Sequence, residues 1–274
     1  MEWIDALADV RAEGRPAVLV TLAEVRGHAP RQAGAKMLVT RDGTWDSIGG
    51  GNLEEAAAVR ARGMLASGAS TPQLEEIALN EHARAEHGLQ CCGGVVKVLL
   101  EPIAPPRPIA LFGLGHVGSE AARIFSRMPV ALHLVDTREE YAAAARREHV
   151  SGGQADVTVH HPTAPESVLR DLPDDTYVLI LTHDHAEDLF LCEAALERMD
   201  RGELNHVGVI GSSAKWARFR KRLREAGHDD ELISEIRCPI GLSEVPGKSP
   251  TSIAVSMAAE YLSRVGSADA EKGE

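Results

Sequence analysis

The sequence predicts an α/β protein in which a small N-terminal α+β domain is followed by a C-terminal Rossmann-like domain built on a parallel sheet. The prediction rests on a proline-rich break at residues 104–108, on a glycine fingerprint directly behind an apolar run, and on alternating apolar and helical segments after it. The break, "APPRP", cannot continue a helix or a central strand. We therefore predict domains at residues 1–104 and 105–274.

Length and charge restrict the class of protein. A chain of 274 residues is long enough for two domains that each bury a core. The 29 basic and 41 acidic residues give a net charge of −12, which argues against nucleic acid as a partner because phosphate binding needs a basic face. The chain begins without a basic segment followed by an apolar one, and no apolar run approaches the roughly 18 residues of a membrane span. We expect a cytoplasmic protein without a membrane partner, with its thiols reduced.

The glycine fingerprint of the second domain is G-x-G-x-x-G. Gly113, Gly115 and Gly118 follow an apolar run and open a helical segment, and Asp136 ends the next apolar run, 23 residues after Gly113. In dinucleotide-binding domains such glycines permit a tight turn, close approach of a pyrophosphate and close helix packing, while an acid meets a ribose hydroxyl. The pattern therefore predicts contact with an anionic ligand, and a purely structural turn is the alternative.

Two further apolar runs, residues 177–185 and 206–216, end in polar clusters. Ligands of parallel sheets bind at the carboxyl ends of the strands, so these clusters should lie at the same edge as the glycine loop. The second cluster offers Ser212 and Ser213 as a helix N-cap, with free backbone N–H groups and Lys215 beside them, which suits an anion, although a plain cap is an equal alternative. The candidate ligand contacts at this edge are Thr182, His183, Ser212 and Lys215.

The first of these clusters, "THDHAED", is also a candidate metal site. His183, Asp184, His185 and Asp188 could be metal ligands, and the two histidines form an H-x-H pair of the kind found in metal-dependent hydrolases. A binuclear motif would need Asp and His where this chain has Glu187 and Asp188. A polar loop at the edge of the sheet is the better interpretation.

The N-terminal domain carries a second glycine-rich loop. The run at 17–25 reads as a strand and "RDG" at 41–43 as a hairpin turn, and Gly49, Gly50 and Gly51 then open a helix. Bare N–H groups before a helix start can bind an anion, and Arg31 and Lys36 would add cationic donors. The alternative is a glycine turn in a small α+β domain.

Two adjacent cysteines, Cys91 and Cys92, precede two more glycines. A disulfide between neighbours would be strained and would not persist in a reducing compartment. Zinc lacks partners, because no second C-x-x-C or nearby Cys/His set has ligand spacing. A working thiol remains, beside the alternative of a small core residue. Since side chains alternate along a strand, at most one of the two should face a given cleft.

Eight short motifs occur together in order along residues 17 to 262. They are "GHAPRQAGAKMLVT", "IGGGNLE", "QCCGGVV", "LFGLGHVG", "THDHAEDL", "GVIGSSAKWARF", "CPIGL" and "GKSPTSIAVSMAAE". With them the chain resembles the xanthine dehydrogenase accessory family, the XdhC/CoxI-type proteins. The family plan, a cysteine-bearing N-terminal domain followed by a Rossmann domain, coincides with the break at "APPRP".

The resemblance implies a chaperone without catalytic residues of its own. Such proteins bind the molybdenum cofactor, hold it while a cysteine desulfurase assists its sulfuration, and deliver it to an apo xanthine dehydrogenase or a related molybdenum hydroxylase. It implies that Cys91 or Cys92 contacts the molybdenum, and that the Gly49–Gly51 loop with Glu54, or the Rossmann edge, holds the pterin or its phosphate. A homodimer is expected from the family. A nucleotide in the Rossmann cleft, and the plain or dinucleotide form of the cargo, stay open.

Two other functions compete. An NAD(P)-dependent oxidoreductase is supported by the Gly113 loop and Asp136, but no Tyr-x-x-x-Lys relay follows either Tyr141 or Tyr261. A metal-dependent hydrolase would rest on His183 and His185. Neither accounts for a thiol pair, a glycine loop and a Rossmann edge in one chain, whereas the chaperone does.

Overall fold

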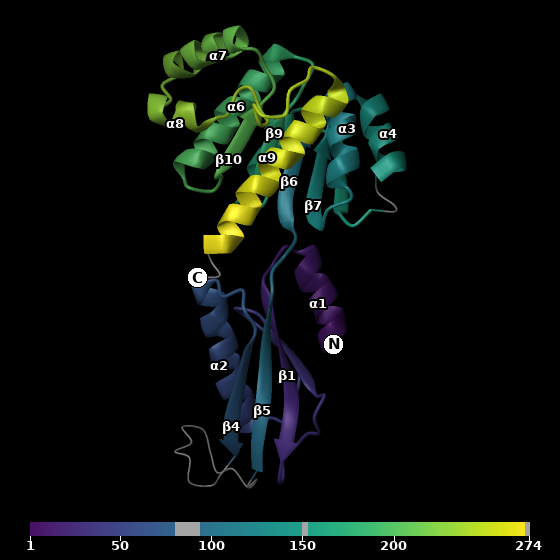
Figure 1. The fold of residues 1–274 in the computed structure, drawn as a ribbon, viewed down its shortest axis with the longest axis vertical. Coiled ribbons are helices and arrows are strands. Elements are labelled where there is room, and N and C mark those ends of the chain that lie inside the picture. Colours follow the sequence, from purple (N-terminus) through teal and green to yellow (C-terminus); the bar gives the residue numbers. More distant parts are fainter. Residues whose placement is uncertain (80–93, 150–152, 272–274) are drawn as a thin grey trace. The chain divides into compact units, whose positions relative to one another are not determined.

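The chain folds into two compact units, each with its own sheet. The computed structural model describes residues 1–79, 94–149 and 153–271. Met1–Pro105 belongs to the first unit and Pro106–Ala268 forms the second, so the division lies inside the proline-rich segment (Figure 1).

The first unit is an antiparallel sheet with two helices. Its elements are α1 (Trp3–Ala12), β1 (Ala17–Arg26), β2 (Lys36–Val39), β3 (Thr44–Asp46), α2 (Gly51–Ser67), β4 (Gln73–Leu79) and β5 (Gly94–Ile103). The strands lie in the order β3-β2-β1-β5-β4, and every neighbouring pair is antiparallel. The predicted hairpin joins β2 to β3, where the Thr40 N–H donates to the Gly43 carbonyl oxygen over 2.9 Å.

The two faces of this sheet are covered by different helices. Val18 and Val20 on β1 pack with the buried side of α2, including Leu53 and Ala57, into one apolar cluster. Ala17, one position away from Val18, packs on the other face with the buried residues of α1. The alternation of side chains along each strand therefore decides whether a residue lies on the α1 face or on the α2 face.

The second unit is a parallel sheet flanked by helices. Its elements are β6 (Arg107–Phe112), α3 (His116–Phe125), β7 (Val130–Val135), α4 (Glu139–His149), β8 (Asp156–His160), α5 (Pro165–Asp171), β9 (Tyr177–Ile180), α6 (His185–Asp200), β10 (His206–Val209), α7 (Ser213–Glu225), α8 (Asp230–Glu235) and α9 (Pro250–Glu271). The order is β10-β9-β6-β7-β8, with every pair parallel. The predicted Rossmann-like parallel sheet is confirmed.

The strand order reverses at β6. The chain runs from β6 outward through β7 to β8, and then returns to place β9 on the other side of β6 and β10 beyond it. In doubly wound sheets a crevice opens at the carboxyl ends of the strands where this reversal occurs. The topology therefore places the crevice above β6, between the segments that follow β7 and β9.

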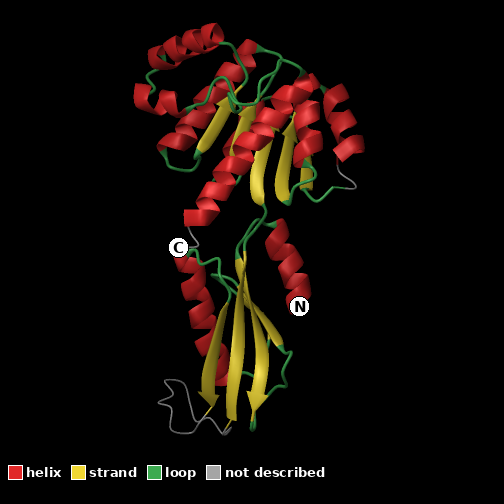
Figure 2. Cartoon of the chain, viewed as in Figure 1, coloured by secondary structure: helices red, strands yellow, loops and turns green. Residues whose placement is uncertain are grey.

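Helices cover both faces of the parallel sheet (Figure 2). One core is formed with α3, α4 and α9 and includes Phe125 and Met257, while the other is formed with α5 to α8 and includes Phe112 and Phe219. Full burial of such a side chain stabilises the fold by about 1.5–3 kcal/mol. Among the residues that the structure describes, no helix is both long and apolar enough to cross a membrane.

Candidate functional site

The glycine fingerprint joins β6 to α3 at the point where the strand order places the crevice. Gly113 follows β6 with a φ of +100°, a conformation that favours glycine. A Cβ on Gly113 would stand 2.5 Å from the Leu181 carbonyl oxygen, and one on Gly118 would collide with the Gly113 carbonyl oxygen. Gly115 faces open space. The first and third glycines therefore allow β6, α3 and the end of β9 to approach closely.

Asp136 lies beside this loop and is turned into the protein. It is buried, and its carboxylate accepts the Leu114 N–H over 2.7 Å and the Arg138 guanidinium over 2.8 and 2.9 Å. Burial raises the pKa of this carboxyl group, but the hydrogen bonds from Arg138 and Leu114 outweigh burial and hold the pKa below its ordinary value. Asp136 is therefore ionised at neutral pH.

A buried ion pair lies on the opposite wall. The Thr182 N–H and hydroxyl both donate to Asp188 Oδ1, over 3.1 and 2.7 Å, and Asp188 Oδ2 pairs with the Lys215 ammonium group. Lys215 also donates to the Ile210 carbonyl oxygen over 2.8 Å. Only 7% of Lys215 and none of Asp188 is exposed, so the pair is buried. Because Asp188 lies in α6 after β9 and Lys215 in α7 after β10, the pair links these two helices.

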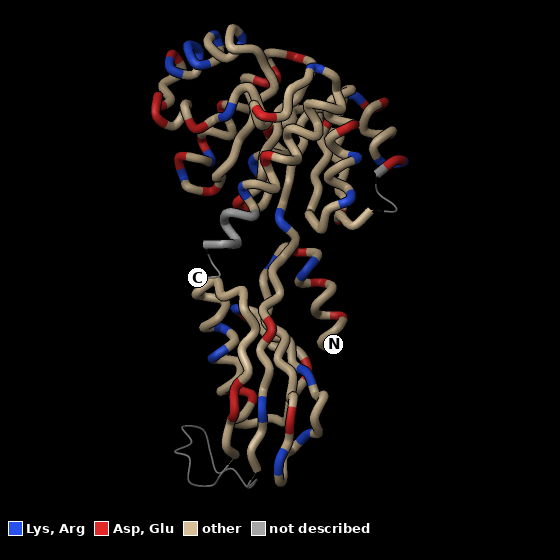
Figure 3. Tube along the Cα trace, viewed as in Figure 1, with Lys and Arg blue, Asp and Glu red and all other residues tan. Residues whose placement is uncertain are grey.

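Of the two serines predicted to cap α7, Ser212 does so and Ser213 is the first residue of the helix. Ser212 Oγ accepts the Lys215 N–H over 3.2 Å at the N-terminus of this helix. Basic residues gather along α7, as Figure 3 shows, although the chain as a whole carries an excess of acids. His183 is exposed on the preceding edge of the crevice.

A thiol lies close to the same edge. Cys238 Sγ–H donates to the Gly211 carbonyl oxygen over 3.8 Å, and burial raises its pKa to about 11 against an opposing effect of Lys215. Cys192 lies on α6 within the hydrophobic core, where burial also raises the pKa of its thiol. Neither thiol is activated as a nucleophile, because nucleophilic cysteines have lowered pKa values.

The glycine loop of the first unit is closed by a carboxylate of its own helix. Glu54 Oε1 accepts the Gly50 N–H over 2.7 Å and the Gly49 N–H over 3.2 Å, and it also contacts the Ser47 hydroxyl. The expectation of bare N–H groups at this loop is therefore wrong for Gly49 and Gly50. The geometry does accept an anion, and here that anion is Glu54, while Gly51 is the first residue of α2.

The two predicted cationic donors differ in position. Arg31 is exposed and follows Pro30, whose side chain would lie 3.1 Å from a Cβ on Gly49, so this segment borders the loop. Lys36 instead donates to Thr21 Oγ1 over 2.8 Å and lies 5.7 Å from the Trp3 ring centroid. The prediction that Lys36 joins the loop is wrong, because strand alternation turns it to the α1 face.

The predicted thiol pair, Cys91 and Cys92, lies outside the described residues, so its role stays a prediction. Among the described residues, no three His, Cys, Asp or Glu side chains form a group suited to a metal ion. His183 and His185 are exposed, and the neighbouring Asp188 is committed to Lys215.

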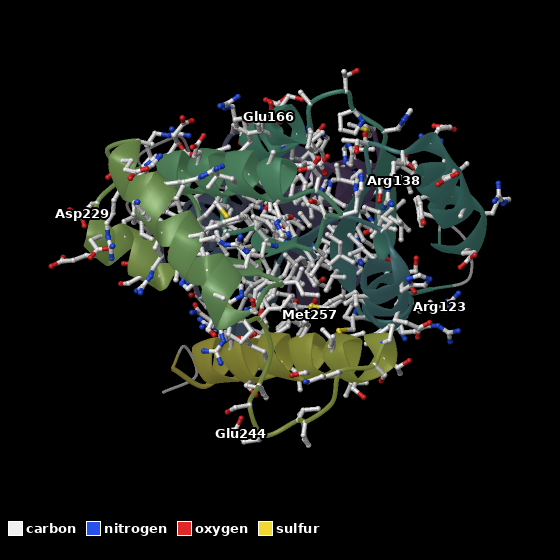
Figure 4. The ribbon with its side chains drawn as sticks, turned by 90° about the horizontal axis from the view of Figure 1, so that it is seen from above. Arg123, Arg138, Glu166, Asp229, Glu244 and Met257 are labelled. Atoms are coloured by element: carbon white, nitrogen blue, oxygen red, sulfur yellow. The ribbon has the colours of Figure 1, made fainter. Side chains whose placement is uncertain are left out.

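The parallel sheet brings Gly113, Asp136, Thr182 and Lys215 to one edge, as its topology requires. Three residues of this edge were missed from the sequence, namely Thr137, Arg138 and Glu187. The guanidinium carbon of Arg138, which is labelled in Figure 4, lies 3.8 Å from the Tyr141 ring centroid, and its guanidinium donates hydrogen bonds to Asp136. The sequence did carry a signal for Arg138, because the side chain of an Arg two residues after an acid at a strand end can fold back and pair with that acid. None was present for Thr137 and Glu187, which are 50 residues apart.

Comparison with known proteins identifies similar chains. Residues 109–261 match the model of the XdhC Rossmann domain, and residues 10–77 match that of the XdhC and CoxI family. The chain is 26% identical to the molybdenum cofactor insertion chaperone PaoD of Escherichia coli, over 91% of this chain and 84% of PaoD. It is 25% identical to the uncharacterized protein YqeB of the same organism, over 93% of this chain but only 44% of YqeB.

A solved structure also resembles the chain over nearly its whole length. It is described as a xanthine dehydrogenase from Bacillus halodurans, it is 20% identical, and it superposes with a TM-score of 0.49 over 97% of this chain and 96% of that one.

Proposed function

The chain belongs to the XdhC and CoxI family, and we propose on this ground that it is a molybdenum cofactor chaperone. The observation that carries the proposal is its relation to a molybdenum cofactor insertion chaperone over 91% of its length, which includes both units. In this proposal the protein holds the cofactor, presents it for sulfuration by a cysteine desulfurase, and delivers it to an apo molybdenum hydroxylase of the xanthine dehydrogenase type.

The two buried carboxylates at the edge of the Rossmann unit are not placed to act as catalytic acids or bases, which agrees with the proposed carrier role. Both carboxylates are engaged with basic partners, Asp136 with Arg138 and Asp188 with Lys215. A general acid or base needs a pKa near the working pH and access to the reacting atom. Asp136 is held ionised and Asp188 is fully buried, so neither meets this need.

The proposed contacts with the cargo divide by chemistry. A soft thiolate from Cys91 or Cys92 would meet the molybdenum and its sulfur ligands. Hydrogen-bond donors would hold the pterin or its phosphate. In the first unit these would be Arg31 and the Gly49 and Gly50 amides, from which the ligand would displace Glu54. At the edge of the Rossmann unit they would be the exposed side chains of His183 and Ser212.

The test is retention and transfer of the cofactor. The full chain is incubated with molybdenum cofactor and separated from unbound material, and the retained pterin and molybdenum are measured. The loaded protein is then mixed with an apo-hydroxylase, whose activity is followed. We expect retention and a gain of hydroxylase activity. A protein that retains neither pterin nor molybdenum would overturn the proposal.

Single substitutions test the thiol assignment separately. We expect one of Cys91→Ser and Cys92→Ser to lose most of the bound molybdenum. Cys238→Ser, which alters a thiol of the Rossmann unit, serves as the control and should retain it. Unchanged molybdenum in both single variants and in the double variant would contradict the thiol role while leaving the chaperone proposal to the transfer assay.

A further inference from the structure

The acid that directly follows β7 has no acceptor position left for a ligand. Asp136 Oδ1 accepts the backbone N–H and Nε–H of Arg138, both over 2.9 Å. Its Oδ2 accepts the Leu114 N–H over 2.7 Å and Nη2–H of Arg138 over 2.8 Å. A carboxylate offers about four lone-pair positions. All four are therefore filled from within the chain.

This arrangement is held firmly. Asp136 is 3% exposed, and its partner Arg138 is fixed on its other side by the Tyr141 ring, whose centroid lies 3.8 Å from the guanidinium carbon. The carboxylate raises the pKa of Arg138 further, so both partners are charged at any pH near neutrality. A guanidinium that meets a carboxylate through two parallel N–H groups forms one of the stronger ion pairs in proteins.

A nucleotide cofactor bound to a Rossmann fold requires the opposite arrangement. The acid at the end of the second strand must accept hydrogen bonds from a ribose diol, and the amides of the glycine loop must face the pyrophosphate. Here the Leu114–Asp136 contact affects both features, because it takes one amide of the glycine loop and one acceptor position of the acid. The second wall of the crevice is joined to the first above this loop, where Thr137 donates to Glu187 over 3.1 Å.

We propose that Asp136 and Arg138 act together as a specificity-determining pair that closes the Rossmann crevice to cofactors that present a free ribose diol to the acid after β7, such as NADH. Arg138 occupies the acceptor positions that a ribose would use, and Asp136 withdraws a loop amide from the pyrophosphate path. The inference goes beyond the chaperone role and does not depend on it, since it concerns which ligands the unit refuses.

The experiment is a titration of the full chain with NADH, followed by nicotinamide fluorescence and by calorimetry, up to about 1 mM, the upper end of ordinary Michaelis constants. We expect no saturable binding by the unmodified protein. In Arg138→Ala two of the four acceptor positions of Asp136 become free, and we expect NADH affinity to rise at least about tenfold, which corresponds to one good hydrogen bond to a charged group.

Three further variants make the outcome specific. Asp136→Asn combined with Arg138→Ala lacks the carboxylate and should bind no better than the unmodified chain. Arg123→Ala, an exposed arginine of α3 paired with Glu120 and Glu148, should also gain nothing. Arg138→Lys keeps the charge without the double contact and should fall between the unmodified chain and Arg138→Ala, which tests the pair even if Arg138→Ala does not fold.

Two results would overturn the proposal. The first is saturable NADH binding by the unmodified protein that Asp136→Asn weakens, because the carboxylate would then already serve a ribose. The second is a folded Arg138→Ala variant that gains no affinity. Neither result bears on cofactor retention, so the chaperone proposal is judged separately.

Discussion

Thr137 and Glu187 join the two walls of the crevice across the end of β6. Thr137 follows β7 and Glu187 lies in the first turn of α6, and the threonine hydroxyl donates to the glutamate carboxylate over 3.1 Å. Since β7 and β9 flank β6 on opposite sides, this single bond spans the position where the strand order reverses. Burial raises the pKa of Glu187, and the Thr137 hydrogen bond and His183 partly oppose the rise.

We predict that Thr137 and Glu187 are energetically coupled. A double-mutant cycle with Thr137→Val and Glu187→Ala should give a coupling free energy of about 0.5–1.5 kcal/mol, the usual net contribution of a hydrogen bond. The measurement is urea unfolding of the four proteins. Thr251→Val, an exposed threonine of α9, replaces Thr137→Val in the control cycle and should show no coupling with Glu187→Ala. Equal coupling in both cycles would contradict the prediction.

The buried pair of Lys215 and Asp188 should be costly to break from one side. Lys215→Met leaves the Asp188 carboxylate buried without its countercharge, and we predict a loss of about 3–5 kcal/mol in the free energy of unfolding. Adding Asp188→Asn should restore part of that loss. Lys221→Met, which removes an exposed pair with Glu225, should cost less than about 1 kcal/mol. If Lys215→Met costs no more than this control, the pair does not hold the crevice wall.

Two glycines of the fingerprint should respond differently to alanine. At Gly113 a Cβ meets the Leu181 carbonyl oxygen and the backbone φ is positive, so Gly113→Ala should cost at least about 2 kcal/mol. At Gly115 the space is open and φ is −62°, so Gly115→Ala should cost less than about 1 kcal/mol. Thermal or denaturant unfolding distinguishes the two, and similar losses would refute the packing role assigned to Gly113.

His206 should make stability depend on pH. Burial, with help from Arg264 and Arg237, lowers the pKa of His206 to about 3, whereas an unfolded histidine titrates near 6.5. The unfolded chain then binds the extra proton, so stability rises with pH. The contribution of neutral His206 is complete above about pH 6.5 and is lost as the pH falls toward 3, with a limiting slope of about 1.4 kcal/mol per pH unit.

A substitution isolates this contribution. His206→Phe keeps a ring against Tyr177, whose centroid lies 3.9 Å away, and cannot be protonated. The free energy of unfolding measured from pH 4.5 to 7 should fall less steeply on acidification in His206→Phe than in the unmodified chain. Tyr177→Phe retains the histidine and should keep the original slope. An unchanged slope in His206→Phe would exclude His206 as its source.

The Rossmann unit could be predicted from the sequence because its signals are local. The spacing of Gly113, Gly115 and Gly118 behind an apolar run reports a backbone turn and close packing, which need no knowledge of distant residues. The edge position of Thr182 and Ser212 follows from the rule for parallel strands. The structure agrees on each of these points.

The sequence could not predict which hydrogen-bond donors and acceptors of the site are already paired with other groups of the chain. The Leu114 amide meets Asp136 across 22 residues of sequence, and nothing in the spacing of a fingerprint records whether its acid points outward or inward. Lys36 was misplaced for a related reason. One residue of register decides the face of a strand, and a short strand after a loop leaves that register undetermined.

The contact between Glu54 and the Gly49–Gly50 amides bears on how a carrier releases its bound ligand. An anion that takes these two amides has to displace Glu54, and when it departs the glutamate returns to them. The amides are never left without an acceptor, so departure exposes no unsatisfied donor and the net affinity is the difference between two similar bonds. In the proposed function, a cargo anion at this loop would exchange places with Glu54, and such exchange is what the proposed delivery of the cofactor requires.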